Sequence, residues 1–167
     1  MRPITWIVVH TCGAYDAVHQ LVVHQSVGTV RTYHKLAKIY GGNGWSDIGY
    51  HRYIEQSGVI RMGRADATVG AHAAGFNAYS LGICCSGHGD FAPFEPAQMT
   101  ALVAQCIAWC RLYHIPPDHV VGHRETSQHG GPRVDKTCPG NLVDMAVIRN
   151  RVRIGFGGGS PDPEVAA

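Results

Sequence analysis

The chain has 167 residues, 45% of them apolar and only 16% charged, which predicts one globular domain with a sizeable core and excludes a disordered chain. Its basic residues are scattered and the net charge is only +2, so we expect no nucleic acid partner. No apolar run approaches the roughly 20 residues of a membrane-spanning helix, so we expect no membrane insertion. The six cysteines include the adjacent pair Cys84 and Cys85, which predicts buried free thiols rather than a disulfide framework.

The N-terminal part predicts a strand followed by a helix. Residues 4–9 are apolar on both alternating sets, as in a central strand that is covered on both faces. We expect the chain to leave the sheet in a loop over residues 10–14. A helical period of apolar residues then runs over 26–40, with Ser26 placed to cap its first turn.

The middle of the chain predicts a hairpin, a loop and a buried strand. Residues 48–56 and 59–62 are typical of two strands joined by a tight turn at Ser57-Gly58. Residues 64–80 are rich in small residues and predict a loop. The apolar run at 81–85 predicts a short buried strand.

The C-terminal part predicts two helices on either side of a strand and a long loop. Apolar residues at helical spacing follow Pro96 and predict a helix to about residue 113. A strand is expected over 119–122, a polar loop over 124–140 and an amphipathic helix over 142–152.

This order of elements predicts an α/β fold. We expect a single domain over residues 1–153, with a mixed central β-sheet flanked by helices on both faces. Residues 154–167 contain Gly-Gly-Gly-Ser-Pro-Asp-Pro and predict a flexible C-terminal tail.

Three residues are candidate metal ligands because of their types and their places after predicted strands. His10 and His123 each follow an apolar strand, and loops that leave neighbouring strands converge on the usual place for a site in an α/β sheet. Cys138, held by the following proline, can supply a third, anionic ligand. Two imidazoles and one thiolate can hold zinc and leave its fourth position open for water, as in a catalytic site. No regular spacing links the three, so each could also be an ordinary hydrogen-bonded residue.

Blocks of residues along the chain carry a family resemblance, namely Val9-His10-Thr11-Cys12, Asp47-Ile48-Gly49-Tyr50-His51, Val69-Gly70-Ala71-His72-Ala73-Ala74-Gly75-Phe76-Asn77, Ser80-Leu81-Gly82-Ile83, Pro96-Ala97-Gln98-Met99, Val121-Gly122-His123-Arg124 and Lys136-Thr137-Cys138-Pro139-Gly140. Together they closely resemble the zinc-dependent N-acetylmuramoyl-L-alanine amidases, over about residues 4 to 150. That family includes phage amidase-type lysozymes, muropeptide-recycling amidases and animal peptidoglycan recognition proteins.

The resemblance implies a role for each matching residue. His10, His123 and Cys138 would hold Zn²⁺. Tyr50 and Lys136 would be catalytic, with Lys136 stabilising the oxyanion and Tyr50 hydrogen-bonding the attacking water or relaying its proton.

Two further residues, His34 and Asn77, match positions that border the family's cleft and are expected to bind substrate. His72 lies in a loop of small residues, where we expect it either to line the groove and contact the peptide stem or to be an ordinary hydrogen-bonded loop histidine. His51 follows Tyr50, so it is expected on the opposite face with a structural role. The segments 36–43 and 124–135 are longer than in the short phage enzymes and leave the substrate preference open.

The function implied by this resemblance is that of an endolysin-like peptidoglycan hydrolase. It would cleave the amide bond between the lactyl group of N-acetylmuramic acid and L-alanine with a zinc-activated water. We expect a monomer, made in the host cytoplasm without a signal peptide, that acts on the cell wall after release. Two alternatives stay open: a catalytically weak peptidoglycan-binding protein of the same fold, and a structural-zinc module in which Cys12 or His72 is a fourth ligand.

Overall fold

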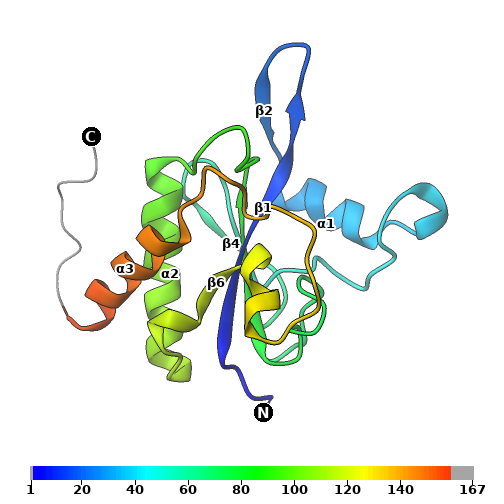
Figure 1. Cartoon of the computed structure of the whole chain (residues 1–167). Helices are drawn as coiled ribbons and strands as arrows, with labels where there is room; N and C mark the ends of the chain where they lie inside the picture. Colours follow the sequence, from blue (N-terminus) through cyan, green and yellow to red (C-terminus); the bar gives the residue numbers. More distant parts are fainter. Residues whose placement is uncertain (1, 159–167) are drawn as a thin grey trace.

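A mixed β-sheet runs through the centre of the computed structural model, which describes residues 2–158 (Figure 1). Its strands in this part of the chain are β1 (Trp6–Asp16), β2 (Leu21–His24), β3 (Arg52–Ile54), β4 (Ile60–Met62), β5 (Ser80–Ser86) and β6 (Val120–Gly122). They lie in the order β2-β1-β5-β3-β4, with β6 also paired to β1. β1 is parallel to β5 and β6, whereas it is antiparallel to β2, and β3 is antiparallel to β4. The predicted mixed sheet is confirmed.

Helices lie on both sides of this sheet, as predicted (Figure 1). The α-helices are α1 (Val27–Lys35), α2 (Pro96–Tyr113) and α3 (Met145–Phe156), and the 3-10 helices are η1 (Lys38–Tyr40), η2 (Pro117–His119) and η3 (His123–His129). In Figure 1, α2 and α3 lie side by side on one side of β1, and α1 lies on the other. Among the described residues, none of the helices combines the length and the apolar character that a membrane span requires.

The alternation of side chains along β1 decides where the site can form. Ile7 and Val9 point into the main core, where they are fully buried with residues of α2 and α3. Val8 and His10 point to the opposite face, because successive side chains of a strand alternate. On that face Val8 packs with Phe76 of the 64–79 loop. The face away from α2 and α3 therefore carries the candidate site.

The prediction that residues 10–14 leave the sheet in a loop was wrong. β1 continues to Asp16, because it stays paired with β5 through Cys12 and then with β2 over residues 13–16. The β1–β2 hairpin extends away from the body of the molecule (Figure 1). His10 thus lies within a strand, where pairing with Cys84 of β5 restricts its backbone.

Helix α1 is shorter than the predicted 26–40. The Ser26 cap is confirmed, since its hydroxyl accepts a hydrogen bond from Thr29 N at 3.1 Å. The helix ends at Lys35, because the next segment folds back and Gly44 N donates to Leu36 O at 2.8 Å. The apolar period beyond residue 36 therefore belongs to η1 and its flanking turns.

The predicted strand over 48–56 contracts to β3. Gly49 N donates to His34 Nδ1 at 3.0 Å, which takes it out of the sheet ladder. The predicted strand at 81–85 and the predicted helix from Pro96 to residue 113 are confirmed by β5 and α2. Part of the predicted 124–140 loop forms η3.

Helix α3 is shifted relative to the predicted 142–152. It begins at Met145 because Asp144 caps it, accepting from Ala146 N at 2.8 Å. It continues to Phe156 and so includes the first residues of the predicted tail at 154–167. The rest of that tail, from residue 159, lies outside the described residues.

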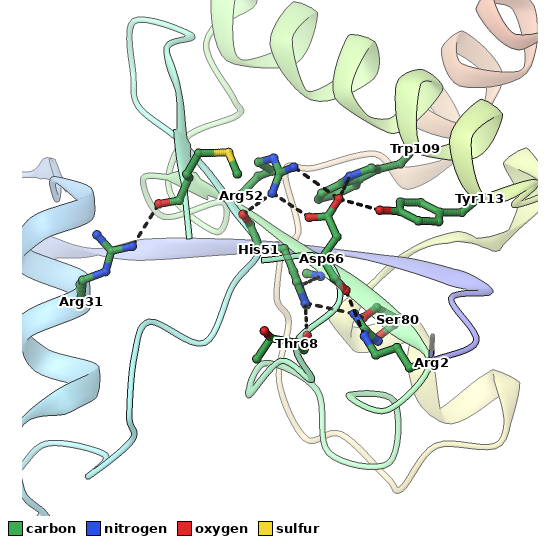
Figure 2. Close-up of polar contacts among 11 residues, drawn as sticks. Arg2, Arg31, His51, Arg52, Asp66, Thr68, Ser80, Trp109 and Tyr113 are labelled. Atoms are coloured by element: carbon green, nitrogen blue, oxygen red, sulfur yellow. Dashed lines mark hydrogen bonds and ion pairs between the residues drawn. The ribbon is translucent and has the colours of Figure 1, made fainter. Parts of the chain in front are cut away.

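A polar network fastens the 64–79 loop to the body of the protein (Figure 2). The Asp66 carboxylate accepts from Arg52 at 2.8 Å and from Trp109 and Tyr113 of α2 at 3.0 Å each. Arg2 donates to the backbone oxygens of Asp66 and Ser80 at 3.1 and 3.0 Å. Hydrogen bonds to a charged group are worth about 1.5–3 kcal/mol each, so this network holds the loop firmly under the site.

His51 belongs to the same network and has the structural role expected of it (Figure 2). Its Nδ1 accepts from Gly82 N at 2.9 Å, so its proton is on Nε2 and donates to Thr68 O at 3.0 Å. Burial lowers the pKa of His51 to about 4, which keeps this ring neutral near pH 7.

Candidate metal centre

His10, His123 and Cys138 lie together on the face of the sheet opposite α2 and α3. One potential ligand atom from each lies within 4.8 Å of the others. β6 ends with Gly122 opposite Val9, so His123 follows directly beside His10, with ring centroids 4.7 Å apart. Cys138 Sγ is 3.7 Å from His10 Nδ1. The structure thus brings the three predicted ligands to one point.

Two charged residues hold the loop that carries Cys138. Arg124 N donates to Cys138 O at 2.7 Å, and the Arg124 guanidinium donates to Thr137 O and Gly140 O at 3.0 and 2.5 Å. Asp90 accepts from the Thr137 hydroxyl. Asp90 has no assigned role in the sequence, because no motif or periodicity links it to the Cys138 loop, which lies far along the chain.

Burial sets the protonation states of the three candidate ligands. It lowers the pKa of His10 well below its usual value, with smaller contributions from His72, His123 and Lys136. It also lowers the pKa of His123 to about 4, and Lys136 adds to this effect. Burial raises the pKa of the Cys138 thiol to about 11. The site therefore offers two neutral imidazoles and a thiol that ionises when a cation lies beside it.

This donor set fits zinc. Two nitrogen ligands and one sulfur ligand suit a tetrahedral Zn²⁺, whereas calcium and magnesium prefer oxygen ligands. Among residues 2–158, the group of candidate ligands does not include Cys12 or His72. Three protein ligands would leave a fourth position for water or substrate, which fits a catalytic rather than a structural zinc site.

A pocket of about 460 Å³ opens beside the candidate ligand His123. Its wall also includes the predicted catalytic residue Lys136, whose side chain is exposed. Residues 132–135, at the end of the 124–135 segment, line it as well. Of the described residues near the 36–43 segment, Trp45 lines this pocket, and sequence reasoning had not singled it out.

Tyr50 lies deeper, against the ligand His10. The two ring centroids are 5.1 Å apart. Burial raises the pKa of Tyr50 well above its usual value, and the neighbouring thiols of Cys84, Cys12 and Cys138 act in the same direction. The Tyr50 hydroxyl therefore stays protonated and can donate a hydrogen bond.

The three predicted substrate-binding residues have different surroundings. His72 lines the pocket, but it is only 9% exposed and its Nδ1 is 3.1 Å from His10 Nε2. Asn77 also lines the pocket, while its side-chain oxygen accepts from the backbone N–H groups of His72 and Ala73 at 2.8 and 2.9 Å. His34 is buried between Trp45 and Tyr50, with ring centroids 4.8 and 5.5 Å away. Contact of each with substrate stays a prediction.

Comparison with known proteins gives one family. The family model described as N-acetylmuramoyl-L-alanine amidase matches residues 1–141. The endolysin of Escherichia phage T7 is 41% identical over 85 residues, which cover 47% of this chain and 52% of that protein. Peptidoglycan-recognition protein SC1a of Drosophila melanogaster is 34% identical over 138 residues, covering 82% of this chain and 68% of that protein.

A solved structure supports the same assignment. N-acetylmuramoyl-L-alanine amidase LysC from Clostridium intestinale URNW matches with a TM-score of 0.71 and 27% identity, covering 90% of this chain and 86% of that one. The matched region spans about half the length of the phage endolysins, 52% in the case of T7. Since the family model covers residues 1–141 of the 167, this chain belongs to the N-acetylmuramoyl-L-alanine amidase family.

Proposed function

We propose that the protein is an endolysin-like peptidoglycan hydrolase that cleaves the amide bond between the lactyl group of N-acetylmuramic acid and L-alanine, with Zn²⁺ held by His10, His123 and Cys138. The observation that carries this proposal is the convergence of the three ligand atoms within 4.8 Å beside an open pocket. Membership of the amidase family supports it. So do the relatives named endolysin.

The metal would supply the electrophile and the nucleophile. When bound, zinc lowers the pKa of a bound water from about 15.7 towards 7 and polarises a carbonyl. The chain supplies the remaining groups. Lys136 lines the same pocket as His123, so its ammonium group can stabilise the negative charge that develops on the carbonyl oxygen. Tyr50, kept protonated by burial beside His10, can orient the attacking water by a hydrogen bond.

The pocket has the chemistry to hold a peptide that begins with a small residue. Its lining includes the small residues Ala71, Ala73 and Ala74 together with Trp45. Arg133 and Asp135 line it as an ion pair at 2.8 Å, so Lys136 supplies its net positive charge. Such a lining suits an alanine side chain followed by a carboxylate-bearing residue, as in a peptidoglycan stem. Peptidoglycan is therefore the proposed partner, and the cell wall, reached after release from the cytoplasm, is the proposed place of action.

The second candidate function is binding of peptidoglycan without cleavage. It is favoured by the 34% identity to Peptidoglycan-recognition protein SC1a over 82% of this chain. The complete ligand set at His10, His123 and Cys138 favours catalysis instead.

Dye-labelled sacculi separate the two functions. We expect the zinc-loaded wild-type protein to release soluble dye, and the Cys138→Ala variant to pellet with the sacculi and release none. A Cys110→Ala variant, which removes a thiol from the main core far from the pocket, should release dye like the wild type if it folds. If the zinc-loaded wild type binds sacculi and releases no dye, the hydrolase proposal is wrong.

A further inference from the structure

The ring of His72 is held in one orientation by glycines on two sides. A Cβ atom at Gly82 of β5 would lie 2.5 Å from His72 Cγ, and one at Gly70 would lie 2.5 Å from His72 Cδ2. Real Cβ atoms do not approach so closely, so the ring occupies space that only glycine leaves free. With 9% of its surface exposed, His72 has little freedom to rotate.

Both nitrogens of this ring meet partners inside the protein. His72 Nδ1 is 3.1 Å from His10 Nε2. On the other side, His72 Nε2 is 3.4 Å from the hydroxyl of Ser80, and that hydroxyl is 2.7 Å from Phe76 O. These contacts form a series of hydrogen bonds that runs from the Phe76 carbonyl through Ser80 and His72 to the candidate ligand His10.

The donor and acceptor of each of these hydrogen bonds follow from the Phe76 carbonyl. Phe76 O can only accept, so the Ser80 hydroxyl donates its proton there and offers a lone pair to His72. His72 Nε2 must then carry the ring proton, which leaves Nδ1 of a neutral ring as an acceptor. His10 Nε2 must be the donor to it.

The result at His10 matches what a metal requires. With its proton on Nε2, His10 has its lone pair on Nδ1, the nitrogen that lies 3.7 Å from Cys138 Sγ. The unprotonated Nδ1 is thus the nitrogen nearest the candidate ligand Cys138, so no proton has to leave it when a cation arrives.

We propose that His72 is a positioning residue for the metal: by accepting from His10 Nε2, it fixes the His10 tautomer and ring orientation that present Nδ1 to zinc, and Ser80 fixes His72 in turn. This inference rests on the zinc site of the proposed function. It assigns both nitrogens of His72 to internal hydrogen bonds, so any contact with substrate would use the carbon edge of the ring. Hydrogen-bond partners of ligand histidines commonly change metal affinity by about 10–100-fold.

Two substitutions test whether His72 acts as a hydrogen-bond acceptor for His10 or only fills space. His72→Leu fills the same cavity without an acceptor, whereas His72→Asn places a side-chain oxygen near the position of Nδ1. We expect zinc affinity, measured by competition with a chromophoric chelator, to fall about 10–100-fold in the leucine variant and only a few-fold in the asparagine variant. His119→Leu is the matched control, because His119 also uses Nδ1 for a hydrogen bond, to Thr5 O at 2.9 Å, at the far end of β1.

A second measurement reports the tautomer directly and needs neither zinc nor substrate. Long-range ¹H–¹⁵N NMR of the zinc-free protein should show the His10 proton on Nε2 in the wild type. It should show a mixture of Nδ1–H and Nε2–H forms in His72→Leu. Ser80→Ala removes the hydroxyl that keeps the proton on His72 Nε2, so a mixture of Nδ1–H and Nε2–H forms should appear at His72.

Several results would overturn the proposal: a wild-type His10 with its proton on Nδ1, a folded His72→Leu variant with wild-type zinc affinity, or equal losses in the leucine and asparagine variants. These readouts are independent of cell-wall cleavage. The zinc affinities could fall in the expected order, from wild type to His72→Asn to His72→Leu, while the wild type cleaves no amide. That result would contradict the proposed function and leave the role of His72 standing.

Discussion

Asp90 accepts a hydrogen bond of 2.5 Å from the hydroxyl of Thr137, the residue that precedes the candidate ligand Cys138. Its second oxygen accepts from Asn141 N at 2.8 Å, on the other side of the Cys138 loop. The Asp90 carboxylate therefore spans the loop and holds both of its ends. A loop held in this way keeps Cys138 Sγ in place before a metal arrives, which lowers the entropy lost on binding.

The Asp90→Ala substitution should weaken zinc binding without unfolding the protein. Loss of two hydrogen bonds to a charged, partly buried group loosens the loop, and we expect about a tenfold lower zinc affinity, or about 1.4 kcal/mol. Chelator competition measures this. Asp16→Ala is a matched control, since the Asp16 carboxylate also bridges a turn by accepting hydrogen bonds, from the backbone of Val18 and His19, but in the β1–β2 hairpin. Equal zinc affinities in the two variants would show that Asp90 does not organise the site.

The Lys136→Ala substitution should reduce turnover and leave the metal in place. Removal of one well-aimed oxyanion donor commonly costs about 10²–10³ in kcat, and the three ligands are untouched. The measurement combines kcat on a muramoyl-peptide with zinc content by atomic absorption. Arg133→Ala removes a positive charge from the same pocket wall, 87% exposed and paired with Asp135, and should have a much smaller effect on kcat. A Lys136→Ala enzyme with wild-type kcat would exclude the oxyanion role.

Zinc binding should release one proton per ion at about pH 6, below the pKa of about 7 of a zinc-bound water. The pKa of Cys138 is raised to about 11 and that of His123 is lowered to about 4, so only the thiol holds a proton that zinc must displace. Zinc affinity should therefore rise about tenfold for each pH unit between about pH 5 and 6.5. Calorimetry in buffers of different ionisation enthalpy counts the protons. A count of zero would mean that Cys138 is not a ligand, or is already ionised.

The zinc-free protein should lose stability as the pH falls from about 6.5 to 4. Burial lowers the pKa of His51 to about 4 in the folded state, so the unfolded chain binds a proton over this range and the folded one does not. The stabilising effect of the neutral ring is complete above the unfolded pKa of about 6.5, and about 3 kcal/mol of it is lost by pH 4.

Urea unfolding at a series of pH values measures this loss. His51→Gln removes the titrating group, so the variant should have a lower stability at pH 7 and a weaker dependence on pH. A wild-type free energy of unfolding that stays constant or increases as the pH falls from about 6.5 to 4 would contradict the burial of a neutral His51.

The parts of the fold that sequence could predict are those with a local pattern. The apolar alternation of β1, the buried run of β5 and the stripe of α2 each gave the correct element, because burial of one face or of both leaves a period in the sequence. The second half of β1 has no such period. Its residues 11–16 are only half-buried or exposed, because residues 13–16 pair with β2 in a hairpin away from the core, so the sequence predicts a loop over residues 10–14 instead.

The candidate site also has features that the sequence could predict and features that it could not. The ligand positions could be proposed from residue types that recur in family motifs, and the structure brings His10, His123 and Cys138 together. The supporting contacts could not be proposed. Asp90 is tied to Thr137, and His72 to His10, by hydrogen bonds between segments far apart in the chain, and no periodicity encodes which loops meet. For His72 the sequence therefore leaves two roles open, a substrate contact and a hydrogen-bonded loop residue, and the contacts of its two ring nitrogens appear only in the structure.

The most direct test of the proposed chemistry is identification of the bond that is cut. Sacculi digested with the zinc-loaded protein are analysed by mass spectrometry after labelling of all new amino groups. We expect peptides with a new amino-terminal L-alanine and glycan strands with newly freed lactyl carboxylates, and none of either with the Cys138→Ala protein. New reducing sugar ends, or new amino termini on residues other than L-alanine, would contradict the assignment of His10, His123 and Cys138 to an N-acetylmuramoyl-L-alanine amidase.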